Sequence, residues 1–132
     1  MGAHSPVIMG ILNLTPDSFS DGGQFDSAQS AVQAARLMVA HGAQIIDVGG
    51  ESTRPGAERI SLEVELERVV PVIEQLSQQG IYVSIDTMRA EVAKAAVDAG
   101  AQMVNDVSGG LSDPHMLRTV ARLGVPIVLM HW

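Results

Sequence analysis

The sequence predicts an α/β fold in which helices cover a parallel sheet. Apolar runs of strand length alternate with stretches of helical period, and the strand runs are almost continuously apolar, which is typical of parallel strands buried on both faces. A weak internal echo, in which residues 42–50 resemble residues 100–110, favours a barrel of repeated βα units. A doubly wound sheet stays open as an alternative, although no GxGxxG fingerprint follows the first strand.

Five apolar runs are expected to form strands, because glycine, proline or polar residues bound each of them. In chain order they are residues 7–12, 44–48, 82–85, 103–104 and 126–130. The first run ends abruptly in the polar stretch NLTPDSFSDGG, which begins at Asn13. That stretch is too polar to belong to the core, so it is expected to be a loop whose polar groups bind a ligand.

Helices are expected between these strands, and a glycine that can end the helix follows each one. In order they are residues 27–41, 61–79, 89–99 and 113–123. Ser61 is expected to cap the second helix, and Pro71 inside it is expected to kink the helix or restart it. The pair Asp113-Pro114 is expected to open the fourth helix, with aspartate as N-cap and proline at the first helical position.

Composition limits the chain to one domain, because 132 residues with 46% hydrophobic content suffice for one core. The absence of cysteine excludes disulfides and thiolate metal sites and favours a reducing, cytoplasmic compartment. No apolar run approaches the roughly 18 residues of a membrane span, and no signal peptide pattern opens the chain. Residues 1–6 are expected to be a tag or a disordered start.

Net charge argues against a nucleic-acid partner. The formal charge is −7, Lys94 is the only lysine and aromatic residues make up 3% of the chain, whereas nucleic-acid surfaces need clustered basic and stacking side chains. A small anionic ligand remains compatible with this charge, because a few arginines in a cleft can act against the global sign.

Polar side chains stand at the carboxyl ends of the expected strands, where ligands bind in parallel α/β folds. They are Asn13, Asp47, Asp86, Asn105, Asp106 and His131. Carboxylates and amides in a cleft suit a flat heterocycle with an amidine-like edge, such as a pterin or purine. Arg54 and nearby glycine N–H groups could hold an anion beside it.

Structural explanations for these residues stay open. Asn13 could shape the turn before Thr15, Asp47 could bind the N–H groups of the glycines after it, and Asp86 could cap the next helix. No histidine pair has zinc-ligand spacing.

Two long stretches carry a family resemblance. ILNLTPDSFSDGG at residues 11–23 and GAQIIDVGGESTRPGA at residues 42–57 resemble the two signatures of the dihydropteroate synthase family. The stretch SIDTMRAEVAKAAVDAGAQMVNDVSGG and the final LMHW follow the same family's pattern. The resemblance implies a (β/α)₈ TIM barrel of the pterin-binding type. This chain supplies about its first five strands and four helices, so residues 1–132 are expected to be a single partial domain.

The resemblance also implies an enzyme, a transferase of folate biosynthesis. Members of the family join 6-hydroxymethyl-7,8-dihydropterin pyrophosphate to p-aminobenzoate, giving 7,8-dihydropteroate and pyrophosphate, and sulfonamides compete with p-aminobenzoate. Mg²⁺ is the implied cofactor and a homodimer the implied state of the full-length parent. A barrel of this kind needs about 250 residues, so the 132-residue chain alone is expected to be inactive.

For the loops, the resemblance implies contacts with the anion and with p-aminobenzoate. Asn13 is expected to contact Mg²⁺ or pyrophosphate. Phe19 and Asp21 are expected on a mobile loop that closes over the p-aminobenzoate site. Thr53 and Arg54 are expected on a second loop that touches pterin or pyrophosphate.

For the pterin, the resemblance implies hydrogen bonds between the ring and Asp86 and Asn105, with Met130 packing beneath the ring. Arg54 and Mg²⁺ would stabilise the departing pyrophosphate, and the Asp86 anion would favour a cationic pterin. Closure of residues 13–23 would exclude water. Asn13, Arg54 and Asp86 are therefore the expected catalytic residues.

Two other functions stay open. One is a related pterin-binding methyltransferase domain that serves a corrinoid protein, although the expected lid at residues 13–23 argues against it. The other is a non-catalytic pterin-binding module, which would bind the pterin without turnover.

Overall fold

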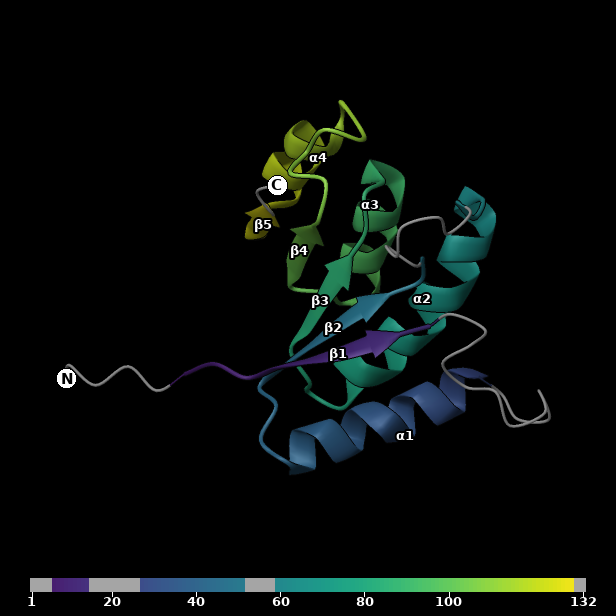
Figure 1. Cartoon of the computed structure of the whole chain (residues 1–132), viewed down its shortest axis with the longest axis vertical. Helices are drawn as coiled ribbons and strands as arrows, with labels where there is room; N and C mark the ends of the chain where they lie inside the picture. Colours follow the sequence, from purple (N-terminus) through teal and green to yellow (C-terminus); the bar gives the residue numbers. More distant parts are fainter. Residues whose placement is uncertain (1–5, 15–26, 52–58, 130–132) are drawn as a thin grey trace.

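The computed structural model describes residues 6–14, 27–51 and 59–129, and in this part five strands alternate strictly with four helices (Figure 1). The elements are β1 (Met9–Asn13), α1 (Ser27–Ala40), β2 (Ile45–Gly49), α2 (Leu62–Gln78), β3 (Val83–Asp86), α3 (Ala90–Ala99), β4 (Met103–Asp106), α4 (Met116–Leu123) and β5 (Ile127–Leu129). The element order expected from the sequence is confirmed, with boundaries that differ by a few residues. None of the helices in the described part is long and apolar enough to cross a membrane.

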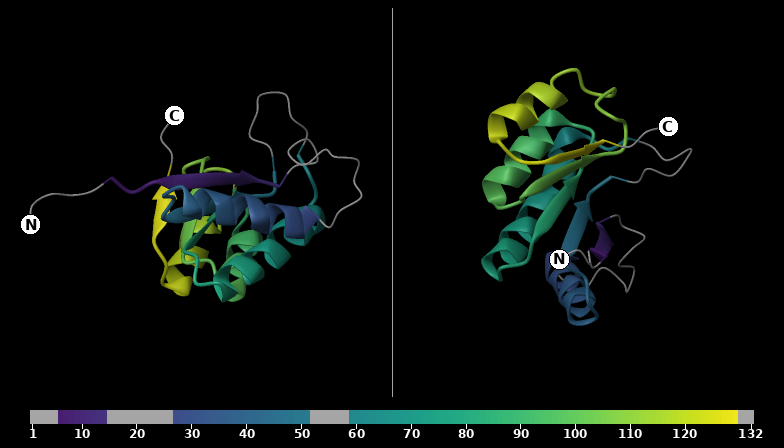
Figure 2. Two further views of the ribbon diagram at one scale, coloured as in Figure 1. Left: turned by 90° about the horizontal axis from the view of Figure 1, so that it is seen from below. Right: turned by 90° about the vertical axis from the view of Figure 1, so that its left-hand side faces the viewer.

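The five strands form one parallel sheet in the order β1-β2-β3-β4-β5. A doubly wound sheet reverses its strand order at a switch point, and the described sheet contains no such reversal. The four helices follow one another around the outside of the sheet (Figures 1 and 2). This sequential arrangement is the one that a (β/α)₈ barrel requires of its first strands.

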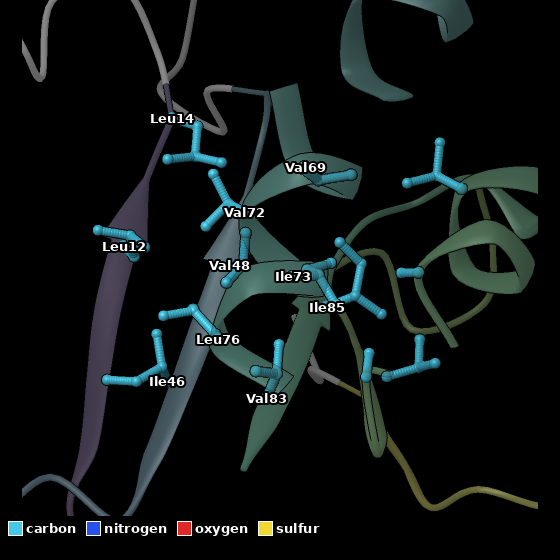
Figure 3. Close-up of a cluster of buried hydrophobic side chains, with 14 of the residues drawn as sticks. Leu12, Leu14, Ile46, Val48, Val69, Val72, Ile73, Leu76, Val83 and Ile85 are labelled. Carbon is cyan, nitrogen blue, oxygen red and sulfur yellow. The ribbon is translucent and has the colours of Figure 1, made fainter. Parts of the chain in front are cut away.

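The core lies between the sheet and its helices (Figure 3). Strand side chains alternate between the two faces, so every second residue of each strand points toward the helices. From the strands, the buried side chains are Leu12, Ile46, Val48, Val83, Ile85 and Val104. Helix α2 adds Val69, Val72, Ile73 and Leu76, which repeat every three to four residues along one face.

Helix α2 has a side-chain N-cap and contains a proline. The Ser61 hydroxyl accepts a hydrogen bond from the Val64 N–H at 3.2 Å, which confirms Ser61 as the N-cap. The expected restart at Pro71 is wrong, because α2 runs unbroken through it. Pro71 lies on the exposed face, and the buried Val69 and Val72 hold the helix against the sheet on either side.

Asp113 caps a different helix from the one expected. Helix α4 begins at Met116, and the Asp113 carboxylate accepts the N–H of His115 at 2.9 Å and the N–H of Ala90 at 2.8 Å. Ala90 is the first residue of α3, so this carboxylate joins the β4–α4 connection to the start of the preceding helix. The hydrogen bond from Ala90 is the main cause that lowers the pKa of Asp113.

The depth of this core predicts the cost of truncating it. Leu76→Ala should lower the free energy of unfolding by about 2–5 kcal/mol, because Leu76 is fully buried and its removal leaves a cavity. Leu37→Ala on α1 is the matched control. Leu37 is 64% exposed, so its loss should change stability by about 0.5 kcal/mol or less. Urea unfolding of both variants would measure the difference, and equal effects would contradict the assignment of the core.

Candidate functional site

Four residues lie side by side across the carboxyl ends of β1 to β4. The strand register pairs Asn13 with Gly49, Gly49 with Asp86, and Asp86 with Asn105. Residues that pair in a parallel sheet point to the same face, so these four form one line, called here the polar row. Their chain neighbours Leu12, Val48, Ile85 and Val104 point into the helix-covered core. The polar row therefore lies on the opposite face of the sheet, away from the helices.

Asp86 occupies the middle of the polar row as a half-buried carboxylate. It accepts no hydrogen bond from any residue that the structure describes. Burial, and after it the nearby carboxylates of Asp47, Glu65 and Asp106, together raise the pKa of Asp86 to about 7. A carboxyl group that titrates near neutrality and has open lone pairs is typical of a ligand or catalytic site.

Asp47 lies one step below the polar row, paired in register with Ser84. It is 2% exposed, and its oxygens accept long hydrogen bonds of 3.4 and 3.5 Å from the Asn105 amide. Burial raises the pKa of Asp47, while Asn105 and the nearby Ser84 hydroxyl, which lies outside normal hydrogen-bond geometry, partly offset that effect.

Neither Asp47 nor Asp86 plays the structural role that the sequence left open. In the described part of the chain, Asp47 accepts from the Asn105 side chain and from no glycine N–H. The first turn of α3 is capped by Thr87 and Asp113, since the Arg89 N–H donates to Thr87 Oγ1 at 3.1 Å and the Ala90 N–H donates to Asp113. Asp86 is thus free to face a ligand.

Two buried polar atoms beside the carboxylates are unsatisfied. Asn105 Oδ1 and Ser84 Oγ have no hydrogen-bond partner among the described residues. An unpaired buried polar atom costs about 1–3 kcal/mol, and most such atoms in proteins find a partner. Together with Asp86, the Asn105 oxygen offers acceptors that suit a planar ligand with several N–H donors.

A buried network behind β3 fixes the strand end that carries Asp86. Glu65 of α2 is fully buried, and its carboxylate accepts from Thr87 Oγ1 at 2.6 Å and from Arg89 Nη1 at 2.6 Å. Thr87 follows Asp86 directly, so this anchor limits the motion of the site carboxylate. Glu65 is not among the residues expected from the sequence to support the site, although it stands four residues before the buried Val69 and so on the apolar face of α2.

The same network joins the two ends of the segment at residues 52–58. Glu51 Oε2 accepts from the Ile60 N–H at 2.9 Å and from Arg59 Nε at 3.3 Å. The Arg89 guanidinium donates to the Ile60 carbonyl at 2.5 Å and lies 3.9 Å from Glu51. Arg89 therefore connects this segment's ends to the anchor at β3.

Asp106, also at the end of β4, has a local structural role. It is fully buried and accepts from the N–H and hydroxyl of Ser108 and from the N–H of Gly110, which shapes the turn after β4. It points toward the helices and does not belong to the polar row.

Three of the expected site residues, Asn13, Asp86 and Asn105, lie together on the polar row. The other five lie outside the described residues, and their roles stay predictions: Phe19, Asp21, Thr53, Arg54 and Met130. The described part contains no group of three or more His, Cys, Asp or Glu side chains that could hold a metal ion.

A family model described as pterin binding enzyme matches residues 9–132. Among curated proteins, the dihydropteroate synthase of Mycobacterium leprae (strain TN) is 59% identical over 129 residues, which cover 97% of this chain and 45% of that protein. The dihydropteroate synthase of Bacillus subtilis (strain 168) is 54% identical over 126 residues, covering 95% of this chain and 44% of that protein. The chain thus spans less than half the length of these curated relatives.

Solved structures give the same result for the fold. A dihydropteroate synthase of Xanthomonas albilineans, solved with 4-aminobenzoic acid, superposes with a TM-score of 0.91 at 51% identity and covers 96% of this chain and 46% of that one. The same organism's enzyme in complex with 7,8-dihydropteroate gives a TM-score of 0.85 at 46% identity, covering 96% of this chain and 45% of that one.

The raised pKa of Asp86 predicts a pH dependence of stability. The unfolded carboxyl loses its proton near pH 3.8 and the folded one near pH 7, so folding takes up a proton between these values. Stability should fall as pH rises from about 4 to about 7. Asp86→Asn removes this cost, so the variant should gain free energy of unfolding over the unchanged protein at pH 8 but not at pH 4. The gain should be only about 1–2 kcal/mol, because water still screens the half-buried group.

Thermal or urea unfolding at pH 4 and pH 8 would measure this change. Asp98→Asn is the control, because Asp98 is an exposed carboxylate on α3. A stability difference between Asp86→Asn and the unchanged protein that is the same at both pH values would contradict the buried, proton-holding state of Asp86.

Proposed function

The chain belongs to the pterin-binding enzyme family, and on that basis we propose that it forms part of a dihydropteroate synthase. The reaction joins the amino group of p-aminobenzoate to the methylene carbon of 6-hydroxymethyl-7,8-dihydropterin pyrophosphate. The carbon–oxygen bond breaks, pyrophosphate leaves with the electron pair, and the attacking nitrogen loses a proton. The names of the relatives compared above favour this activity over a methyltransferase domain or a non-catalytic module.

The carrying observation is the unpaired acceptor surface of the polar row. Asp86 has no hydrogen bond within the described part of the chain, and Asn105 Oδ1 is a buried acceptor without a partner there. A pterin presents an amino group and ring N–H groups along one edge, which can donate to both residues. Donation to a carboxylate makes charge-assisted hydrogen bonds, worth about 1.5–3 kcal/mol each.

Asp86 acts on the charge of the bound ring in this proposal. Its raised pKa indicates that burial and the neighbouring carboxylates disfavour the anion. A ring that gains positive character as the carbon–oxygen bond loosens stabilises that anion, and this attraction is strongest in the transition state. Asp86 thereby stabilises the reacting pterin more than the resting one.

Asn13 marks the side of the row where the pyrophosphate binds. Its exposed side chain stands at the end of β1, and Arg54 adds a positive charge in this proposal. Mg²⁺ fits this residue set, because the ion typically keeps several waters and takes one or two protein oxygens together with phosphates. When bound, Mg²⁺ would supply positive charge that offsets the negative charge of the departing pyrophosphate.

Further assignments follow from the same proposal. Phe19 and Asp21 contact p-aminobenzoate, Thr53 contacts the pterin or pyrophosphate, and Met130 packs beneath the ring. The proposed function also predicts that sulfonamides compete with p-aminobenzoate, that the protein is cytoplasmic and that the full-length parent is a homodimer.

The proposal predicts a loss of pterin affinity in Asp86→Asn. In the natural protein that carries this sequence, calorimetric titration with the pterin pyrophosphate should show affinity reduced at least about tenfold, or roughly 1.4 kcal/mol. Asp98→Asn, a matched change on the exposed face of α3, should bind as the unchanged protein does. Affinity of Asp86→Asn within about threefold of the unchanged protein would refute the role given to Asp86. Formation of dihydropteroate in the same samples tests the activity directly.

Phe19→Ala should separate the two substrates. Because Phe19 is assigned to p-aminobenzoate alone, its truncation should weaken binding of p-aminobenzoate and sulfonamides by about tenfold and leave pterin binding within about twofold. Competition binding with a labelled sulfonamide, beside pterin titration, would measure both affinities. Equal weakening of the two ligands would overturn the assignment.

A further inference from the structure

The polar row carries a side chain on β1, β3 and β4 but none on β2. Gly49 is the member from β2, and it lies between Asn13 and Asp86. The row therefore lacks a side chain at the position beside the site carboxylate. Figure 1 shows β2 between β1 and β3, so Gly49 lies between the strands that carry Asn13 and Asp86.

The backbone does not require a glycine at this position. Gly49 is not among the described glycines with a positive φ. A Cβ atom placed on it would lie 3.5 Å from both Cβ and Oδ2 of Asp86 and 3.7 Å from Cγ of Asp86. These are ordinary van der Waals distances, so the fold could accept alanine here.

The neighbouring Gly50 shows what a sterically required glycine looks like. A Cβ atom on Gly50 would lie 2.9 Å from Cγ1 of Val69 and 3.3 Å from the carbonyl oxygen of Glu65. Gly50 therefore lets the chain pass close to α2. The two adjacent glycines differ in kind, since only Gly50 is needed for packing.

Glycine inside a strand is unfavourable by itself. It costs about 0.5–1 kcal/mol relative to alanine, because the unfolded chain loses more freedom and no side chain packs. Where packing and φ give no reason for a glycine, close approach of a ligand or of another backbone segment is a common one. At Gly49 the position that a Cβ atom would take adjoins Asp86, the residue that meets the ligand in the proposed function.

We infer that Gly49 determines substrate specificity by leaving room for the group that links the pterin to its pyrophosphate. This inference rests on the proposed function, which places the ring at Asp86 and Asn105 and the pyrophosphate at Asn13. Adjacent strands lie about 4.8 Å apart, so β3 and β1 are separated by about 10 Å across Gly49. The methylene whose bond to oxygen breaks lies between ring and pyrophosphate, and it therefore crosses the row at Gly49.

The experiment compares two ligands with two variants in the natural protein that carries this sequence. The ligands are the pterin pyrophosphate and a pterin unsubstituted at the linking position. Gly49→Ala should lower the affinity for the pterin pyrophosphate by at least about tenfold and the affinity for the unsubstituted pterin by less than about threefold. The reason is that the added methyl group fills the path of the linker only. Its melting temperature should stay within about 2 °C of the unchanged protein.

Gly50→Ala is the matched control. It should lower the melting temperature, because the added methyl meets Val69 and the α2 backbone. Measured below that temperature, it should keep the ratio of the two affinities.

Three results would overturn the inference: equal loss of both ligands in Gly49→Ala, no loss of either, or loss of the fold in that variant. A wild-type protein that binds neither ligand would refute the proposed function itself, so the two failures are distinguishable.

Discussion

The regular register of the parallel sheet is the constraint on which the site depends. Each strand is paired with its neighbour without a break from β1 to β5. Because side chains alternate along a strand, this register sends Leu12, Val48 and Ile85 into the core and keeps their neighbours on the other face. A slip of one residue in any strand would move its polar row member under the helices. The register that buries the apolar side chains is therefore the same one that brings the polar row together.

Buried charge on the helix side supports the charge on the open side. Glu65 is completely buried, and such a carboxylate is tolerated only when it is paired and hydrogen-bonded. Thr87 and Arg89 supply those partners at 2.6 Å. Glu65 also adds to the field that favours the protonated form of Asp86. Glu65 and its partners thus limit the motion of the strand end that carries Asp86 and make ionisation of Asp86 less favourable.

The sequence predicted the order of elements because apolar period and glycine stops are local signals. It also predicted that Asn13, Asp86 and Asn105 gather at one edge, since strand ends in a parallel sheet converge. It missed the partner of Asp113, because the N–H that this residue caps belongs to Ala90, 23 residues earlier in the chain. It also missed the buried Glu65, which reads in sequence as an ordinary charged helix position. Long-range hydrogen bonds leave no local pattern to read.

The bond from Ala90 to Asp113 bears on how such folds evolve. Repeated βα units invite the view that a barrel can be assembled by adding or exchanging units one at a time. Here the first N–H of the third helix donates to a carboxylate that belongs to the fourth unit, so a cut between these units removes one of the two groups that cap this helix. Successful recombination of these sequences should therefore follow breakpoints after residue 113, which keep donor and acceptor in the same piece.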